Sequence, residues 1–233
     1  MNRFNRINKR DAISKMVVCG VFAAFAYVCV CVFRIKVSFL TLDIKDAVIT
    51  TAAMLINPLA GVAISAVVAL LEMVTISDTS YYGFIMNFLS SASFSLVASF
   101  IYRSRKTLAF AIIGLCTAAV TLTAVMMLAN LFITPYYMSV ERSTVVGLIP
   151  VLLLPFNLTK AILNAALVMI IYKPISAALR RAKVLKSSGV ESSKYSLVRT
   201  VVVSVSAVVL LIICILVFFL VLGAEIQFFK VKG

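Results

Sequence analysis

A lysine and two asparagines interrupt one of the most apolar stretches of the chain. Asn157, Lys160 and Asn164 lie in a run from 145 to 171 that is otherwise almost wholly apolar. A lysine at the centre of a bilayer costs about 2.5 to 3.5 kcal/mol on insertion scales, so an ionisable residue there indicates a functional site. The i, i+3, i+7 spacing places the three side chains on one stripe of a helix. We therefore predict a ligand site on this helix.

Two possible helix starts leave the depth of Lys160 open. Pro155 can occupy the first position of a helix, and Lys160 would then lie only about 8 Å from the start by the helical rise. Its ammonium group would be close enough to snorkel to the membrane surface. A helix starting near Gly147 would place Lys160 about 20 Å down by the same rise, where snorkelling fails. A helix start at Pro155 thus favours a snorkelling lysine, and a start near Gly147 favours a ligand site.

The composition predicts an all-α polytopic membrane protein. Hydrophobic residues make up 63% of the chain, mean hydropathy is +1.13, and apolar runs recur from 16 to 223. The net charge of +14 does not indicate nucleic-acid binding, because the basic residues lie between the apolar runs without interleaved aromatic residues. The chain contains no His, no P-loop, no C-x-x-C pair and no paired-carboxylate motif, which argues against an enzyme, a metal site or ATP hydrolysis by this chain.

Seven spans account for the apolar runs. The break at Asn57-Pro58 divides one overlong run into two helices, and this choice places most of the 22 Lys and Arg residues on one side. By the positive-inside rule that side, which includes the N-terminus, is cytoplasmic. The loop at 34–45 then lies outside, where its alternating pattern favours an extended chain covering a site. The predicted spans are about 16–33, 44–56, 59–76, 83–102, 108–133, 147–172 and 200–223.

On this topology the remaining polar side chains gather at the outer ends of the helices. They are Asn87, Asn130 and the loop residues Thr41 and Asp43, besides Asn157 and Lys160. Asn donates and accepts hydrogen bonds whereas Lys only donates, so the site suits a planar heterocycle whose edge alternates C=O with N–H. Aromatic residues are available as flat walls for such a ring: Phe39, Phe84, Phe88, Tyr136, Tyr137 and Phe156.

Small residues mark a second candidate surface on the first helix. Gly20 and Ala24 have small-xxx-small spacing, and Ala23 lies beside them. Such spacing lets another membrane helix approach closely. Because it is also common in ordinary helix packing, the sequence leaves a partner interface and internal packing open.

Several motifs together resemble the riboflavin-specific S components of energy-coupling factor (ECF) vitamin transporters, over about 16–179. The resemblance implies a six-helix S-component bundle holding riboflavin at its outer face, with contacts from Asn130, Asn157 and Lys160. The motifs are Leu42-Asp43-Ile44 with Asp46, Asn57-Pro58-Leu59-Ala60-Gly61-Val62, Met86-Asn87-Phe88-Leu89, Asn130 with the following aromatic loop, Pro155-Phe156-Asn157-Leu158-Thr159-Lys160, and Tyr172-Lys173-Pro174.

The resemblance also implies partners and a division of the chain. A membrane T component carrying two cytoplasmic ATPases would dock through Gly20, Ala23 and Ala24, with riboflavin as transported ligand and no cofactor. The expected parts are a basic cytoplasmic N-terminus (1–15), the six-helix domain (16–179), a basic linker (180–199), an extra membrane helix (200–224) and an external tail (225–233). Alternatives are an S component for FMN or another vitamin, and a membrane scaffold without a small ligand.

Overall fold

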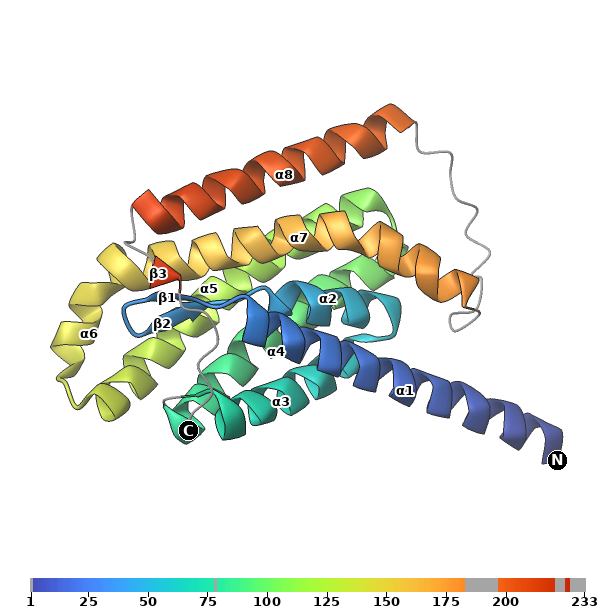
Figure 1. The fold of residues 1–233 in the computed structure, drawn as a ribbon, viewed down its shortest axis with the longest axis horizontal. Helices are drawn as coiled ribbons and strands as arrows, with labels where there is room; N and C mark the ends of the chain where they lie inside the picture. The colour runs from blue at the N-terminus through green and yellow to red at the C-terminus, as the bar shows by residue number, and fades with distance from the viewer. Residues whose placement is uncertain (1, 78, 183–196, 221–224, 227–233) are drawn as a thin grey trace.

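The computed structural model describes residues 2–77, 79–182, 197–220 and 225–226. This part of the chain is mainly helical (Figure 1). The helices are α1 (Asn2–Val32), α2 (Lys45–Leu55), α3 (Pro58–Thr75), α4 (Ser80–Arg105), α5 (Leu108–Met138), α6 (Arg142–Leu148), the π-helical turn η1 (Ile149–Leu153), α7 (Leu154–Arg181) and α8 (Leu197–Leu220).

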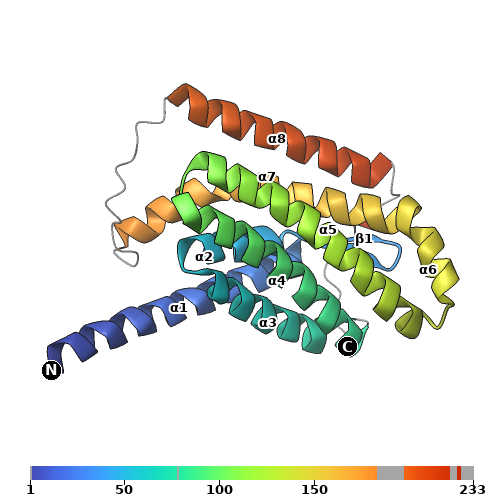
Figure 2. The ribbon, with the colours of Figure 1, turned by 180° about the vertical axis from the view of Figure 1, so that it is seen from behind.

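Three short strands form a small sheet at one end of the bundle. β1 (Ile35–Val37) and β2 (Leu40–Leu42) make an antiparallel hairpin, in which Ser38 takes the left-handed conformation of the turn with φ 55°. β3 (Glu225–Ile226) pairs antiparallel with the other edge of β1. The expectation of an extended chain within 34–45 is therefore confirmed. The opposite end holds the start of α1 and the end of α7 (Figures 1 and 2).

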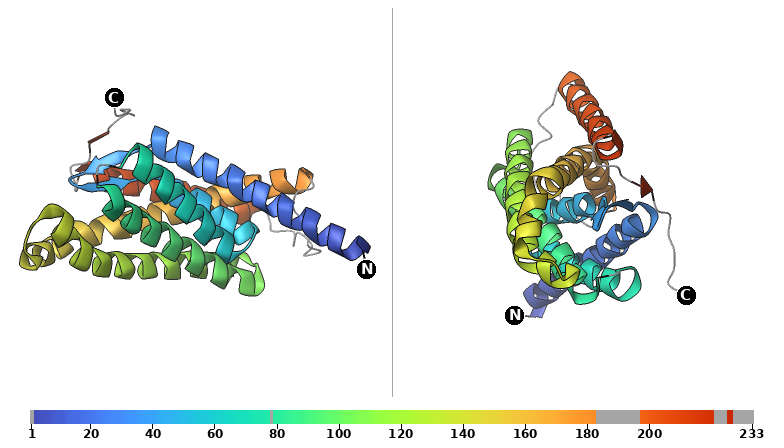
Figure 3. Two further views of the ribbon diagram at one scale, coloured as in Figure 1. Left: turned by 90° about the horizontal axis from the view of Figure 1, so that it is seen from below. Right: turned by 90° about the vertical axis from the view of Figure 1, so that its left-hand side faces the viewer.

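The core is divided between two groups of helices. One apolar cluster joins α4, α5 and α7 around Phe94 and Leu122, and another joins α1, α2 and α3 around Ile49 and Ile64. α2 lies between the groups and is buried along nearly its whole length. In the end-on view of Figure 3, α8 stands on the outside of the bundle next to α7.

The predicted break between the second and third helices is confirmed. Asn57 caps α3, with its side-chain oxygen accepting a hydrogen bond from the Ala60 amide at 2.6 Å, and Pro58 occupies the first turn. The prediction that the fifth helix ends near 133 is wrong, because α5 continues through Pro135 to Met138. Ser139 then ends α5 in a left-handed conformation.

Five described helical segments are long and apolar enough to cross a membrane. They are Ala12–Val32, Pro58–Thr75, Ser80–Arg105, Leu108–Met138 and the continuous Arg142–Arg181, and α8 contains a shorter apolar stretch, Val205–Val217. A polytopic helical membrane protein is thus confirmed. The division into 1–15, 16–179, 180–199, 200–224 and 225–233 stays a prediction, and 183–196, 221–224 and 227–233 lie outside the described residues.

Gly61 permits the close approach of α2, α3 and α4. A Cβ at this position would lie 2.7 Å from Cβ of Ala53 and 3.0 Å from Oγ of Ser95. We predict that Gly61→Leu lowers the free energy of unfolding by about 1 to 3 kcal/mol through overpacking, measured as a lower melting temperature in detergent. Gly147→Leu is the control, because a Cβ there meets nothing within 4 Å. Equal melting temperatures for the two variants would contradict this packing.

Candidate functional site

A cavity of about 270 Å³ lies beside the hairpin. Its volume is close to the lower end of the range for small-molecule sites, about 300 to 1,000 Å³. The hairpin forms one wall, α4 and the loop before it form another, and residues of α1, α3, α5 and α7 complete it. Residues from these elements that line it include Lys36, Thr41, Asp43, Glu72, Asn87, Asn130, Asn157 and Lys160.

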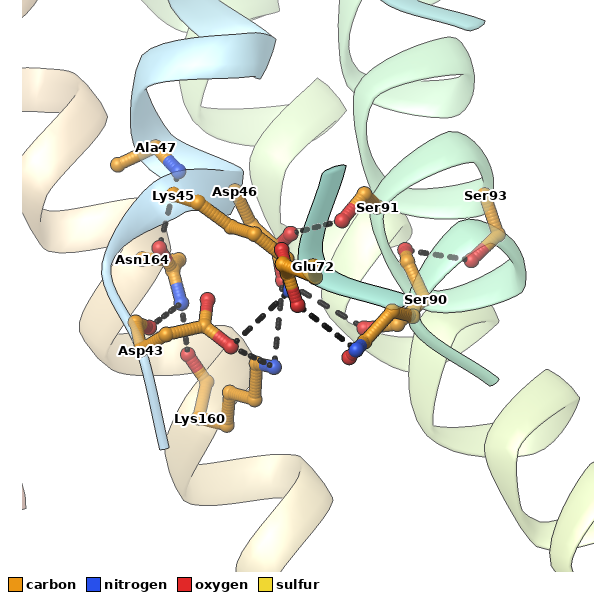
Figure 4. A network of polar contacts seen from close by, with 11 residues as sticks. Asp43, Lys45, Asp46, Ala47, Glu72, Ser90, Ser91, Ser93, Lys160 and Asn164 are labelled. Carbon is orange, nitrogen blue, oxygen red and sulfur yellow. Dashed lines mark hydrogen bonds and ion pairs between the residues drawn. The ribbon is translucent and has the colours of Figure 1, made fainter. Parts of the chain in front are cut away.

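Five buried charged side chains form the floor of this region (Figure 4). Nζ of Lys160 lies 3.0 Å from Oδ2 of Asp43, and Nζ of Lys45 lies 3.3 Å from the same oxygen. Lys45 also pairs with Glu72 at 2.7 Å. Lys160 reaches Asp46 at 3.7 Å, so one network joins α2, the residues before it, α3 and α7. We call Asp43, Lys45, Asp46, Glu72 and Lys160 the buried charge network.

Neutral polar groups donate further hydrogen bonds to two carboxylates of the network. The hydroxyl groups of Ser91 and Ser90 donate to Asp46, and Nδ2 of Asn87 donates to Glu72 at 2.7 Å. Burial alone would raise the pKa of Asp43, but the ammonium groups of Lys160 and Lys45 outweigh that effect and hold the pKa below its ordinary value. Oδ1 of Asp43 is buried and accepts no hydrogen bond from the described residues.

Lys160 is deeply placed and does not snorkel. The helix runs from Arg142 through the π-helical turn, which contains Pro150, into α7, so the later start at Pro155 is not a free helix end. The Lys160 side chain is 4% exposed and its ammonium group is held by carboxylates. The snorkelling interpretation is therefore wrong. The π-helical turn contains Pro150, and Pro155 lies in the first turn of α7; both prolines lack a backbone donor.

The structure brings six of the seven predicted ligand residues to the cavity. Asn87, Asn130, Asn157, Lys160, Thr41 and Asp43 all line it. Asn164 lies behind it, where its side-chain oxygen accepts from the Ala47 amide at 2.9 Å and its Nδ2 donates to the carbonyl groups of Asp43 and Lys160. Asn164 thus fixes the start of α2 against α7. Direct contact between any of the seven and a ligand stays a prediction.

Sequence reasoning missed Lys45 and Glu72. The sequence contains no paired-carboxylate motif, yet Asp43, Asp46 and Glu72 meet at one place. Glu72 could have been found by the rule applied to Lys160, since it is the sole charged residue of α3. Its pairing with Lys45 connects residues 27 positions apart and has no local signal.

The aromatic wall differs in part from the expectation. Phe39, Tyr137 and Phe156 line the cavity, and Tyr82 joins them. Phe84 and Phe88 are not among the lining residues and stack on each other with ring centroids 6.2 Å apart. Tyr136 is 65% exposed and also lies outside the lining.

The small residues of α1 do not share one environment. Gly20 and Ala24 are exposed, whereas Ala23 is 6% exposed and packs in the cluster between α1, α2 and α3. The predicted partner surface is therefore restricted to Gly20 and Ala24. Ala23 belongs to the core.

A bundle of membrane-length helices with a solute-sized, polar-floored cavity at one end defines a membrane protein of the solute-binding class. The family model of the ECF transporter substrate-specific component matches residues 14–172. The chain therefore belongs to this family, which consists of the substrate-binding components of transporters and not of enzymes.

Two individual proteins are similar to this chain. Riboflavin transporter RibU of Staphylococcus aureus (strain TCH60) is 29% identical over 149 residues, which cover 61% of this chain and 78% of that protein. A solved structure described as "Structure and mechanism of the S component of a bacterial ECF transporter" superimposes with a TM-score of 0.61 and 28% identity. The match covers 72% of this chain and 98% of the chain in that structure.

The buried charge network predicts a strong dependence of stability on Lys45. Lys45→Met leaves Asp43 and Glu72 without their shared cation, and breaking a buried pair costs about 3 to 5 kcal/mol. We expect a markedly lower melting temperature in detergent, with part of the loss regained in Lys45→Met/Glu72→Met. Lys106→Met, at an exposed lysine, is the control. A Lys45→Met protein that melts like the parent would show that the network does not hold the fold.

Proposed function

We propose that this chain captures riboflavin at the outer face of the cell membrane and delivers it inward as the S component of an ECF transporter. The observation that carries the proposal is the grouping of Asn130, Asn157 and Lys160 around one cavity, in a chain similar to a riboflavin transporter. The N-terminus would be cytoplasmic, because the basic residues concentrate at the end of the bundle opposite the cavity.

The amides that line the cavity are held in place before any ligand binds. Nδ2 of Asn130 donates to the Met126 carbonyl at 2.7 Å, and the Thr134 hydroxyl group donates to Oδ1 of Asn130. Nδ2 of Asn157 donates to the Leu153 carbonyl at 2.8 Å. Each Nδ2 has a second hydrogen, which a ligand acceptor in the cavity would take up. Such preorganised donors lower the cost of binding.

The donors and acceptors correspond to the two parts of riboflavin. The flavin ring presents carbonyl oxygens, which would accept from the amide groups and from Lys160, and its flat faces would lie against Phe39, Tyr137 or Phe156. The ribityl chain presents hydroxyl donors, which suit the unpartnered Oδ1 of Asp43. A ligand with both a planar heterocycle and a polyol therefore uses both kinds of group.

We predict that Asn157→Ala weakens riboflavin binding at least tenfold, about 1.4 kcal/mol, with a similar loss for Lys160→Ala. The loss follows from removing a donor from the cavity, and quenching of flavin fluorescence measures it. Leu158→Ala is the neighbouring control, because that side chain is 41% exposed on the outside of α7. The same titration with FMN tests the flavin-nucleotide alternative. Unchanged riboflavin affinity in both variants would refute the proposed site.

Transport requires partners, which we propose are a membrane T component and two cytoplasmic ATPases docking on α1. Gly20→Leu and Ala24→Leu should leave riboflavin binding intact and lower uptake in cells that contain these partners, because added bulk blocks close helix approach. A Cβ at Gly20 meets nothing within 4 Å inside this chain, so the fold should tolerate the change. Val21→Leu is the control, because it is a conservative change at a neighbouring exposed position of the same helix. Loss of riboflavin binding in detergent would instead assign these positions to the fold.

A further inference from the structure

α8 and β3 lie beyond the part of the chain that matches the family model, which ends at residue 172. α8 packs along α7, and β3 pairs with β1 (Figures 1 and 3). We call α8 together with β3 the C-terminal extension. It pairs with the hairpin as a third strand and shares an apolar cluster with it. The hairpin is at the same time a wall of the cavity.

The hairpin has two chemically different faces. Lys36 and Thr41 are directly opposite each other and both line the cavity. Ile35 and Leu42 form the next pair and are buried, at 4% and 0% exposure, in a cluster with Phe156 of α7. The same cluster contains Cys214 of α8, with Ile215 and Phe219 packed against it. The apolar face of the hairpin therefore packs in a cluster to which both α7 and the C-terminal extension contribute, and the polar pair Lys36 and Thr41 faces the cavity.

Such a hairpin needs support from outside itself. Each of its strands has three residues, and an isolated two-stranded hairpin is at best marginally stable in water. A third strand and cover for the apolar face are the usual means of stabilising it. The C-terminal extension supplies the third strand and part of the cover.

We propose that the C-terminal extension fastens the β1–β2 hairpin over the cavity and so slows the escape of bound ligand. Ile215 and Phe219 are positioning residues in this arrangement, since they pack against the cluster that contains Ile35 and Leu42 and do not themselves line the cavity. Loosening the extension lets the hairpin leave its place and opens the cavity wall. The proposal rests on the proposed function only for the choice of riboflavin as the probe.

The first test compares two double variants of the full-length chain. Ile215→Ala/Phe219→Ala truncates two side chains that pack against the cluster containing Ile35 and Leu42. The control, Ile213→Ala/Leu216→Ala, truncates two side chains of α8 at residues that are each 50% exposed. For the first variant we expect faster hydrogen exchange at amides 35–42 and about tenfold faster riboflavin dissociation, with neither change in the control. Unchanged exchange, or faster exchange with unchanged dissociation, would overturn the proposal.

The second test joins the strands directly. Ile35 and Ile226 are register partners, and antiparallel partners have Cα atoms about 4.5 to 5.5 Å apart, within the range for a disulfide. In a background with the five native cysteines replaced by alanine, Ile35→Cys/Ile226→Cys should oxidise readily and slow riboflavin release, while Ser38→Cys/Ile226→Cys should not cross-link. If Ile35→Cys/Ile226→Cys fails to cross-link, β3 does not lie beside β1 and the proposal is overturned. A parent chain that binds no riboflavin would refute the proposed function alone, because exchange and cross-linking need no ligand.

Discussion

Charged side chains enclosed in apolar surroundings are the constraint on which this structure depends. Each must keep its partner, because an unpaired charge away from water is far more costly than the pair itself. Asp43 precedes α2, Lys45 and Asp46 begin it, Glu72 lies on α3 and Lys160 on α7. The need to keep these partners together fixes the start of α2 relative to two other helices. Because β2 ends at Leu42, one end of the hairpin is fixed by the same contacts.

The short second helix explains why a cavity exists. α2 has 11 residues, about 16 Å at the helical rise, roughly half of the apolar thickness of a bilayer. Because α2 is too short to extend the full length of the bundle, it leaves space beyond its N-terminus. The hairpin covers this space but does not fill it. The first amide groups of α2 would be costly there without partners. The side chain of Asn164 accepts one of them, from Ala47.

The sequence predicts helices and faces better than it predicts which faces meet. The stripe of Asn157, Lys160 and Asn164 is visible because helical spacing is local. Asn157 lines the cavity, whereas Asn164 lies behind it. This difference depends on where α2 packs, and no local sequence pattern predicts it. The continuation of α5 through Pro135 is likewise a result of tertiary packing that outweighs a helix-breaking residue. The hairpin followed from period-two alternation, but its third strand comes from 190 positions later.

The floor and the wall of the cavity differ in how easily they can open. Opening the floor separates ion pairs in apolar surroundings, at about 3 to 5 kcal/mol for each pair broken. Opening the wall exchanges a few strand hydrogen bonds for bonds to water, at about 0.5 to 1.5 kcal/mol each, and exposes the apolar face of the hairpin around Ile35 and Leu42, but it separates no ion pair of the network. The wall also lies at the end of the bundle, whereas the floor lies among the helices. On the proposed function, a solute would enter and leave by way of the hairpin, and the contacts behind the hairpin would set the rate.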